Sequence, residues 1–349
     1  MGNNPALLQL RAVLSALDPA DGPAPGLAAL ALAECDRLPL PGAGATLQRW
    51  QALALVAQHD LSLAKLFEGH TDALAIMAEL NAPAALADRD AGGTRTLWGM
   101  WAAEAPAGRA LIEPAGKGQV VLSGAKCWCS GAAQLSHALL TAWWADGRGP
   151  QLVSVAMGQA GVQVDASAWV AVGMVGSASV DVAFGGCAAD LIGEPGAYLT
   201  RPGFWQGGAG VAACWYGGSL ALAQTLRRSL LQGPEAGRSP FRWAALGKVD
   251  LSLQGTAAVL RDAALWIDRH PLADASAVAL RARLAAEGSA RLVLDEAGRA
   301  LGAAPFCRDA RFARAAADLP VFVRQSHAER DFAALGERAG AADESIWCL

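Results

Sequence analysis

The spacing of apolar residues changes twice along the chain, and this change restricts the fold more than any other feature. Residues 27–88 carry apolar side chains at helical spacing. Residues 94–191 instead hold short stretches rich in β-branched and aromatic residues, separated by glycine-bearing turns. Helical spacing returns after Pro202. The order is therefore helices, then strands, then helices.

Individual elements can be placed within this order. Short strands are expected at residues 119–122, 138–144, 151–157 and 180–184. Long helices are expected at residues 204–232, 249–269, 274–301 and 313–336, a pattern typical of a four-helix bundle. We therefore expect a mainly α protein with a central β domain. Its predicted parts are an N-terminal helical domain (1–93), a middle β domain (94–198) and a C-terminal four-helix bundle (199–349).

Composition and charge exclude several classes of protein. Hydrophobic residues make up 53% of the 349 residues and charged residues 17%, which allows a large core and argues against a disordered chain. The net charge is -4, and no block of Lys or Arg is present to bind nucleic acid or anionic lipid. The N-terminus lacks the pattern of a signal peptide, and the apolar runs are too short to span a bilayer. We expect a cytoplasmic enzyme.

The seven cysteines are scattered and lack the C-x-x-C spacing of a zinc or redox site. We expect them to be reduced, with no metal bound. Cys127 and Cys129 are two residues apart in a predicted strand, so their side chains are expected on one face. The simplest interpretation is that both pack in the core.

The segment from Gly124 to Gly131 is the strongest candidate for a binding surface. Trp128 and Ser130 are two residues apart on a strand and are expected to point the same way. A flat, electron-poor ring could stack on the indole while the hydroxyl bonds a ring nitrogen. The alternative is a Trp packed inside the sheet, which is common for a strand Trp.

Several segments, in order, resemble motifs of the acyl-CoA dehydrogenase family. Residues 57–64, with His70 beyond them, look like its N-terminal helix pair. The other matches are residues 102–108 to T-E-P-x-A-G, 124–130 to G-x-K-x-W-I-T, 173–179 to G-M-R-G-S/T, 238–241 to R-x-x-F and 299–302 to Q-x-x-G-G. The resemblance covers nearly the whole chain. It implies an acyl-CoA dehydrogenase-like fold, with a β-barrel-like middle domain.

The resemblance also implies a bound FAD between the β domain and the bundle. Its binding residues would be Trp128 against the isoalloxazine, Ser130 at the N5 edge, and Cys129, Ala103, Arg238, Phe241, Arg299 and Gly302. The family's subunits share FAD sites, so a homodimer or homotetramer is implied, with Arg238 at pyrophosphate and Phe241 near adenine. An electron-transfer flavoprotein is the implied redox partner. The substrate would be an acyl thioester or another small molecule.

The chain departs from the family at several of these positions. The family's Thr is Ala103, the Ser of its A-G-S-D is Arg109, and the Gln of Q-x-x-G-G is Arg299. Several side-chain hydrogen bonds to flavin would therefore be lost. Backbone amides, which are present whatever the side chain, could replace some of them.

The family's catalytic Glu is also missing. Its aligned position is Ser326, which cannot accept the substrate's α-proton unaided, and residues 204–218, where other members carry the Glu, contain no acid. His327 and Glu329 are the nearest substitutes, because an imidazole titrates near neutral pH. On a continuous helix Ser326 and Glu329 would be neighbours. The alternative is a solvated helical face with alternating charges.

Three functions are compatible with these residues. The first is an FAD-dependent oxidoreductase acting on a CH–CH bond of an acyl thioester, with His327 or Glu329 as the base. The second is a flavin-dependent monooxygenase of the same fold, since some relatives resemble this chain in lacking the Glu. The third is a degenerate member that serves as a binding subunit.

Overall fold

The computed structural model describes residues 4–18, 21–82, 95–104, 108–116, 119–232, 239–342 and 347. Its internal contacts divide the chain into two compact units. The first unit comprises Met1–Leu38 and Ser62–Phe204, and the second comprises Pro39–Leu61 and Trp205–Leu349. The domain limits at residues 93 and 198 stay predictions.

The helices of the first unit form where sequence signals favour them. They are α1 (Pro5–Ala16), α2 (Pro23–Leu32), most of α4 (Leu61–Glu79) and α6 (Ala197–Thr200). Asn4 caps α1 by accepting the N–H of Ala6 at 3.0 Å, and Pro5 at the first turn needs no hydrogen-bond acceptor. Along α1 the buried residues recur at i, i+3 and i+7, at Leu7, Leu10 and Leu14.

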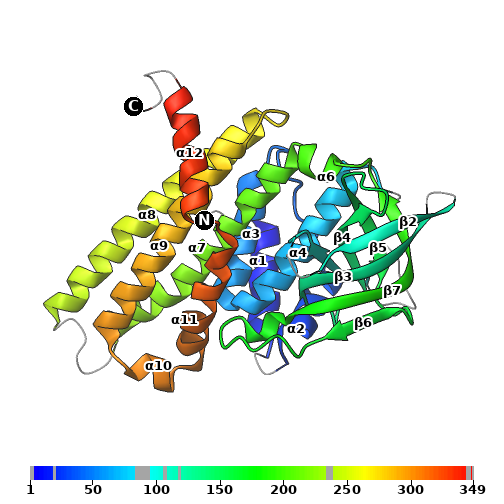
Figure 1. Cartoon of the computed structure of the whole chain (residues 1–349). Helices are drawn as coiled ribbons and strands as arrows, with labels where there is room; N and C mark the ends of the chain where they lie inside the picture. Colours follow the sequence, from blue (N-terminus) through cyan, green and yellow to red (C-terminus); the bar gives the residue numbers. More distant parts are fainter. Residues whose placement is uncertain are drawn as a thin grey trace. The chain divides into compact units, whose positions relative to one another are not determined.

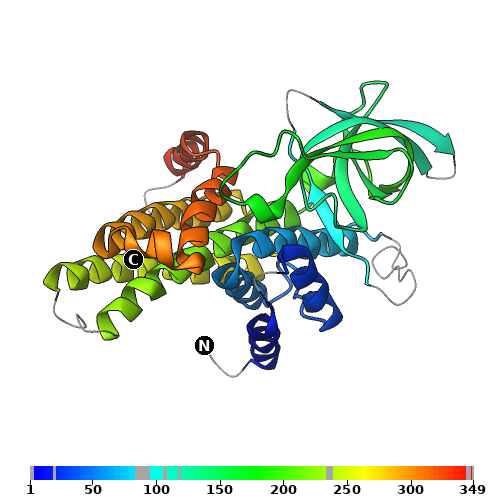
Figure 2. The same cartoon turned by 90° about the horizontal axis from the view of Figure 1, so that it is seen from below.

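The remainder of the first unit is a closed β sheet (Figures 1 and 2). Its strands are β1 (Trp98–Trp101), β2 (Ala110–Gly116), β3 (Gln119–Ser130), β4 (His137–Trp144), β5 (Pro150–Ala156), β6 (Val162–Asp165) and β7 (Ser179–Ile192). The path β4-β2-β3-β7-β5 closes because β5 pairs with both β7 and β4. Closure leaves few unpaired edges, and it confirms the β-barrel-like domain expected from the sequence.

All four predicted strands are confirmed, within β3, β4, β5 and β7, whereas β1, β2 and β6 were not predicted. In β3 the side chains of Val120 and Leu122 are buried while those of Gln119 and Val121 are exposed, which is the alternation of a strand with one face on the core. The core of the barrel contains large apolar side chains from most strands, including Trp101, Ile112, Leu140, Val153 and Phe184.

The second unit consists of helices. They are α3 (Thr46–His59), α7 (Gly203–Leu231), α8 (Pro240–Arg269), α9 (Ser276–Leu301), α10 (Ala304–Arg308), α11 (Ala310–Phe322) and α12 (Glu329–Ala341). The long helices α8 and α9 lie side by side and antiparallel (Figure 1). Lys248 pairs with Glu296 at 2.7 Å, and two turns further along α8 Thr256 donates to the Ala285 carbonyl at 3.3 Å. These helices confirm the predicted C-terminal bundle.

The fourth helix of the bundle differs from the prediction. A single helix over residues 313–336 was expected, but α11 ends at Phe322, the short 3-10 turn η2 (Val323–Gln325) follows, and α12 begins at Glu329. Pro320 lies in the last turn of α11 and cannot donate a backbone hydrogen bond there. Ala328 has a φ of +48°, outside the helical region. Ser326 and His327 therefore lie in a turn and not on a helix.

Within the described segments, no helix combines the length and apolar character needed to cross a bilayer.

Candidate functional site

A β-bulge presents Trp128 at the surface of the first unit. Lys126 of β3 faces Val182 of β7 and Cys129 faces Val180, so two residues of β3 lie opposite one residue of β7. Trp128 is the second residue of the bulge and has a φ of +58°, in the left-handed region. Its side chain is 56% exposed. The indole is therefore not packed in the sheet's core, and the backbone beneath it is strained by about 1–2 kcal/mol.

The bulge also separates the two cysteines. Cys129 is fully buried in the barrel core, whereas Cys127 is half-buried. The prediction that they share a face is wrong, because the extra residue shifts the alternation of the strand between them. Burial raises the pKa of the Cys129 thiol far above its ordinary value, so this thiol is an uncharged core group.

Ser130 joins a group of three hydroxyls beside the bulge. Its Oγ lies 2.7 Å from Oγ of Ser179, its partner in the β3–β7 register, and Ser179 Oγ lies 3.0 Å from Ser177 Oγ. Ser177 in turn donates to the Met174 carbonyl at 2.8 Å. Ser130 is only 8% exposed, and its backbone carbonyl accepts the indole N–H of Trp101 at 3.1 Å. Ser130 is thus held through its hydroxyl by Ser179 and through its backbone carbonyl by Trp101.

An ion pair between a buried ammonium group and a part-exposed carboxylate holds the segment that contains Ala103. Ala103 is exposed, and the next residue, Glu104, accepts a hydrogen bond from the ammonium group of Lys126 at 2.7 Å. Lys126 is 1% exposed and also donates to the carbonyl and hydroxyl oxygens of Thr141, at 3.0 and 2.7 Å. The second Glu104 oxygen accepts the indole N–H of Trp143 at 3.3 Å. These contacts fix the Ala103 segment against β3 and β4.

The two members of this pair have shifted pKa values. Burial raises the pKa of Glu104, but hydrogen bonds from Lys126, Thr141 and Trp143 and the charge of Lys126 lower it by more, so the net shift is downward. Burial lowers the pKa of Lys126, and Glu104 offsets only part of that shift. The effect on Glu104 has the clearer structural cause, because its carboxylate accepts three side-chain hydrogen bonds.

The catalytic candidates of the second unit lie together in the turn before α12. Ser326 is buried, and its Oγ accepts the N–H of Ala328 at 3.2 Å. His327 is 66% exposed, with Nδ1 3.3 Å from Oδ1 of Asp331. Glu329 is exposed in the first turn of α12. The prediction that Ser326 and Glu329 are neighbours on one helix is wrong, because the helix is broken between them.

Asp331 was missed by sequence reasoning. Its carboxylate accepts the backbone N–H of His327 at 3.1 Å and contacts the imidazole, an arrangement that orients the ring. The spacing His-x-x-x-Asp was a usable signal.

The remaining candidates are residues of the second unit. Arg238 lies outside the described residues. Phe241 is 84% exposed at the start of α8, and Arg299 forms an exposed ion pair with Asp295 at 3.4 Å. Gly302 ends α9 with a φ of +67°. Arg242 donates to the Ala300 carbonyl at 3.1 Å, so Phe241, Arg299 and Gly302 lie at the same end of the bundle.

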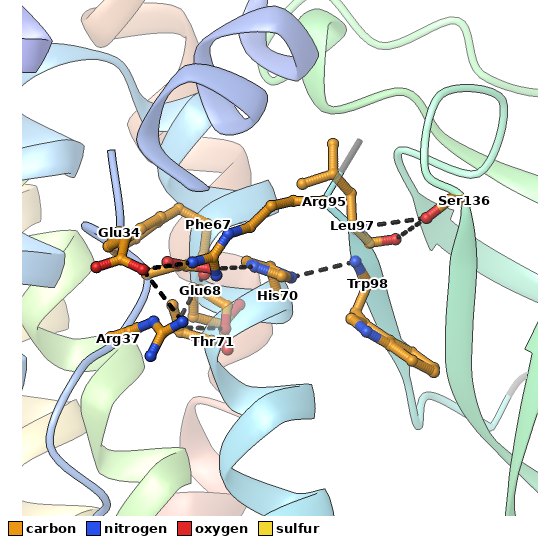
Figure 3. Close-up of polar contacts among 11 residues, drawn as sticks. Glu34, Arg37, Phe67, Glu68, His70, Thr71, Arg95, Leu97, Trp98 and Ser136 are labelled. Carbon is orange, nitrogen blue, oxygen red and sulfur yellow. Dashed lines mark hydrogen bonds and ion pairs between the residues drawn. The ribbon is translucent and has the colours of Figure 1, made fainter. Parts of the chain in front are cut away.

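A second titratable cluster of the first unit is closed to solvent. His70 Nδ1 accepts the backbone N–H of Trp98 at 3.1 Å (Figure 3). Its Nε2 lies 3.2 Å from the Asp36 carboxylate. A ring nitrogen that accepts an N–H carries no proton, so His70 is neutral and donates from Nε2. Arg95 lies 3.6 Å from Asp36. Both His70 and Asp36 are buried, so this pair serves the fold and not a substrate.

No group of three or more potential metal ligands occurs among the residues that the structure describes. The candidate site in the first unit comprises the exposed indole of Trp128, the nearly buried hydroxyl of Ser130 and the anchored segment of Ala103. An exposed indole can stack on a flat aromatic ligand, and a serine hydroxyl can form one hydrogen bond to the edge of such a ligand.

No protein-family model matches the chain, and no curated protein matches its sequence. Solved structures do match. KijD3, in complex with FMN and dTDP-3-amino-2,3,6-trideoxy-4-keto-3-methyl-D-glucose, has a TM-score of 0.79 at 19% identity, covering 97% of this chain and 93% of that chain. TdsC from Paenibacillus sp. A11-2, in complex with FMN and indole, has a TM-score of 0.78 at 19% identity, covering 96% of both chains.

MsuC, a methanesulfinate monooxygenase from Pseudomonas fluorescens, has a TM-score of 0.72 at 19% identity, covering 97% of both chains. TdsC is a dibenzothiophene monooxygenase. The likeness to these structures shows that the chain has the acyl-CoA dehydrogenase-like fold, as expected from the sequence.

Proposed function

We propose that this protein is a flavin-dependent monooxygenase that uses reduced flavin mononucleotide. The observation that carries the proposal is the exposed indole of Trp128 on a strained bulge, two residues before the fixed hydroxyl of Ser130. Backbone strain at a surface aromatic persists where the surroundings hold it and is frequent at ligand sites. The resemblance to the acyl-CoA dehydrogenase family implies that the isoalloxazine ring of the flavin contacts these same two residues.

The residues present fit a flavin. The indole offers a flat face for the isoalloxazine, and Ser130 offers one hydroxyl for its edge. Ala103 lies on an exposed segment fixed by Glu104, where its backbone can contact a ligand. Cys129 is buried, so it can contribute only backbone.

Two observations favour the monooxygenase over an acyl-CoA dehydrogenase. The buried Ser326 hydroxyl occupies the family's Glu position and is no base for an α-proton. The structural neighbours TdsC and MsuC are monooxygenases. The acyl thioester reaction, with His327 or Glu329 as base, is the second candidate, and a degenerate binding subunit is the third.

When bound, reduced flavin supplies the two electrons with which O2 is split between substrate and water. The balance is substrate, O2 and reduced FMN giving hydroxylated substrate, water and FMN. His327 is the residue we assign to proton movement. Asp331 accepts its Nδ1–H, which leaves Nε2 to accept or return a proton.

We propose FMN in place of FAD, because two structural neighbours were solved with FMN. The adenine half of FAD would contact Arg238 and Phe241 of a neighbouring subunit. Phe241 is almost fully exposed, as such a contact requires, so the choice of FMN rests on the structural neighbours alone. A homodimer or homotetramer is proposed from the resemblance, and light scattering on the purified protein tests it.

The experiment has two stages. Purified protein is titrated with FMN and with FAD, and binding is followed by flavin fluorescence and absorption. Oxygen uptake is then measured with an NADH-driven flavin reductase, using indole, dibenzothiophene and methanesulfinate as substrates. Hydroxylated or oxygenated product supports the proposal. Uptake that yields only peroxide with every substrate counts against it, and anaerobic bleaching of the flavin by an acyl thioester would favour the dehydrogenase.

A further inference from the structure

The hydroxyls of Ser130, Ser179 and Ser177 form a hydrogen-bonded chain beside the bulge. The donor and the acceptor in each of its bonds can be deduced by starting from Ser177. A hydroxyl has one proton and two acceptor lone pairs. Ser177 Oγ is 2.8 Å from the carbonyl oxygen of Met174, which can only accept, so Ser177 gives its proton there. Toward Ser179, 3.0 Å away, Ser177 must therefore accept.

The next steps follow in the same way. Ser179 donates to Ser177, so its single proton is used. Toward Ser130, at 2.7 Å, Ser179 can only accept, and Ser130 must donate to it. The proton of Ser130 is thus directed into the protein, and the free lone pair of its oxygen is directed away from Ser179.

The bond from Ser177 to Met174 favours this order over its reverse. The backbone around the chain is held in place, because the N–H of Gly131 donates to the Ser177 carbonyl at 2.9 Å and the Trp101 indole N–H donates to the Ser130 carbonyl. Ser177 is buried, and Ser130 nearly so. Reversal would cost the hydrogen bond from the Ser177 hydroxyl to the Met174 carbonyl, about the worth of one neutral hydrogen bond, because that carbonyl also accepts the backbone N–H of Ser177 at 3.0 Å.

We infer that Ser179 and Ser177 are positioning residues that make the Ser130 hydroxyl a hydrogen-bond acceptor toward its ligand. This inference rests on the proposed function, in which Ser130 meets N5 of the flavin. Oxidised flavin has a lone pair at N5, and reduced flavin has an N–H there. An acceptor at this position selects the reduced form, which is the form a monooxygenase must bind from solution.

The test measures binding of both redox states, not turnover. Dissociation constants for oxidised FMN and, anaerobically, for reduced FMN are measured for the wild type and for Ser179→Ala. The variant releases the Ser130 proton to face the ligand. We expect the preference for reduced over oxidised FMN to fall roughly 3- to 10-fold, the effect of one neutral hydrogen bond. The same change appears as a lower midpoint potential of the bound flavin.

Two further variants isolate the cause. Ser179→Thr keeps the hydroxyl and should restore the wild-type preference. Ser154→Ala removes another buried hydroxyl of the barrel, from β5, where Ser154 faces Asp190, and should leave the preference unchanged. If Ser179→Ala does not fold, Ser177→Ala replaces it, because it lets Ser179 donate to Ser130 and shifts the preference in the same direction.

The outcomes are distinct. An unchanged preference in Ser179→Ala, or an equal loss of affinity for both redox states, overturns the inference and leaves the flavin site standing. Failure of the wild type to bind FMN in either state overturns the proposed function itself.

Discussion

Asp331 contacts His327 at two points. Its carboxylate accepts the backbone N–H of His327 at 3.1 Å and lies 3.3 Å from Nδ1 of the ring. The first contact fixes the turn before α12, and the second sets the tautomer, with the proton on Nδ1 and the lone pair on Nε2. The exposed Nε2 is thereby prepared to act as a base.

We expect His327→Gln to lower the hydroxylation rate by roughly 10²- to 10⁴-fold, the usual contribution of a positioned acid or base. Asp331→Asn should have a smaller effect, because Nε2 is still present but the ring is less well oriented. FMN affinity should stay the same in both variants. Product formation is measured under saturating reduced FMN. Glu329→Gln is the control, and a loss of rate in it comparable to that of His327→Gln would contradict the assignment.

Trp128 should lower the stability of the fold and contribute to ligand binding. Trp128→Gly removes the left-handed strain of about 1–2 kcal/mol and adds a chain-entropy cost of about 0.5–1 kcal/mol. We expect the free energy of unfolding to rise by up to about 1.5 kcal/mol while FMN affinity falls roughly tenfold. Denaturant unfolding and fluorescence titration measure the two effects. Trp128→Phe keeps both the ring and the strain, so it should retain affinity to within a few-fold.

The Glu104–Lys126 pair should respond unequally to loss of either partner. Glu104→Gln leaves a buried ammonium without a counter-charge, and we expect a loss of about 3 kcal/mol in unfolding free energy. Lys126→Met leaves a part-exposed carboxylate that water can solvate, so the loss should be about 1–2 kcal/mol. Urea unfolding of both variants compares them. Equal losses would show that burial of the ammonium does not dominate.

Acid should weaken the same pair. Hydrogen bonds and the charge of Lys126 lower the pKa of Glu104 in the folded protein despite its burial. Its stabilising contribution is therefore complete above the unfolded pKa of about 4.3 and is lost as pH falls through the lower folded value. The difference in unfolding free energy between the wild type and Glu104→Gln should shrink below about pH 4.3. A difference that is constant down to pH 3 would contradict this.

His70 should matter for stability alone. His70→Ala leaves the Trp98 N–H and the Asp36 carboxylate without their buried partner, and each such group costs about 1–3 kcal/mol. We expect a loss of about 2–6 kcal/mol in thermal or urea unfolding, with unchanged FMN affinity per folded molecule. His327→Ala, at an exposed position, should change stability by less than about 0.5 kcal/mol.

The spacing of apolar residues predicted the order of helices and strands, because burial of one face makes apolar residues recur about every 3.6 residues in a helix and every second residue in a strand. The strands of residues 138–144 and 180–184 and the long helices α7 and α9 lie where that period predicted them. Periodicity failed at residues 323–328. A turn of six residues shifts the helical spacing of apolar residues too little to be detected in the sequence. The interruption of the helix depends on Pro320, which lacks an N–H, and on Asp331, which accepts the backbone N–H of His327.

The candidate site, too, was predicted only in part from the sequence. The sequence identified Trp128 and Ser130 by their two-residue spacing together with the resemblance of residues 124–130 to the family motif G-x-K-x-W-I-T. Only the folded barrel showed that a bulge exposes the indole, that Ser179 lies opposite Ser130, and that Glu104 meets Lys126 across 22 residues of chain. These relations join segments that are distant along the chain, and their geometry is set by register and packing, which no local pattern contains.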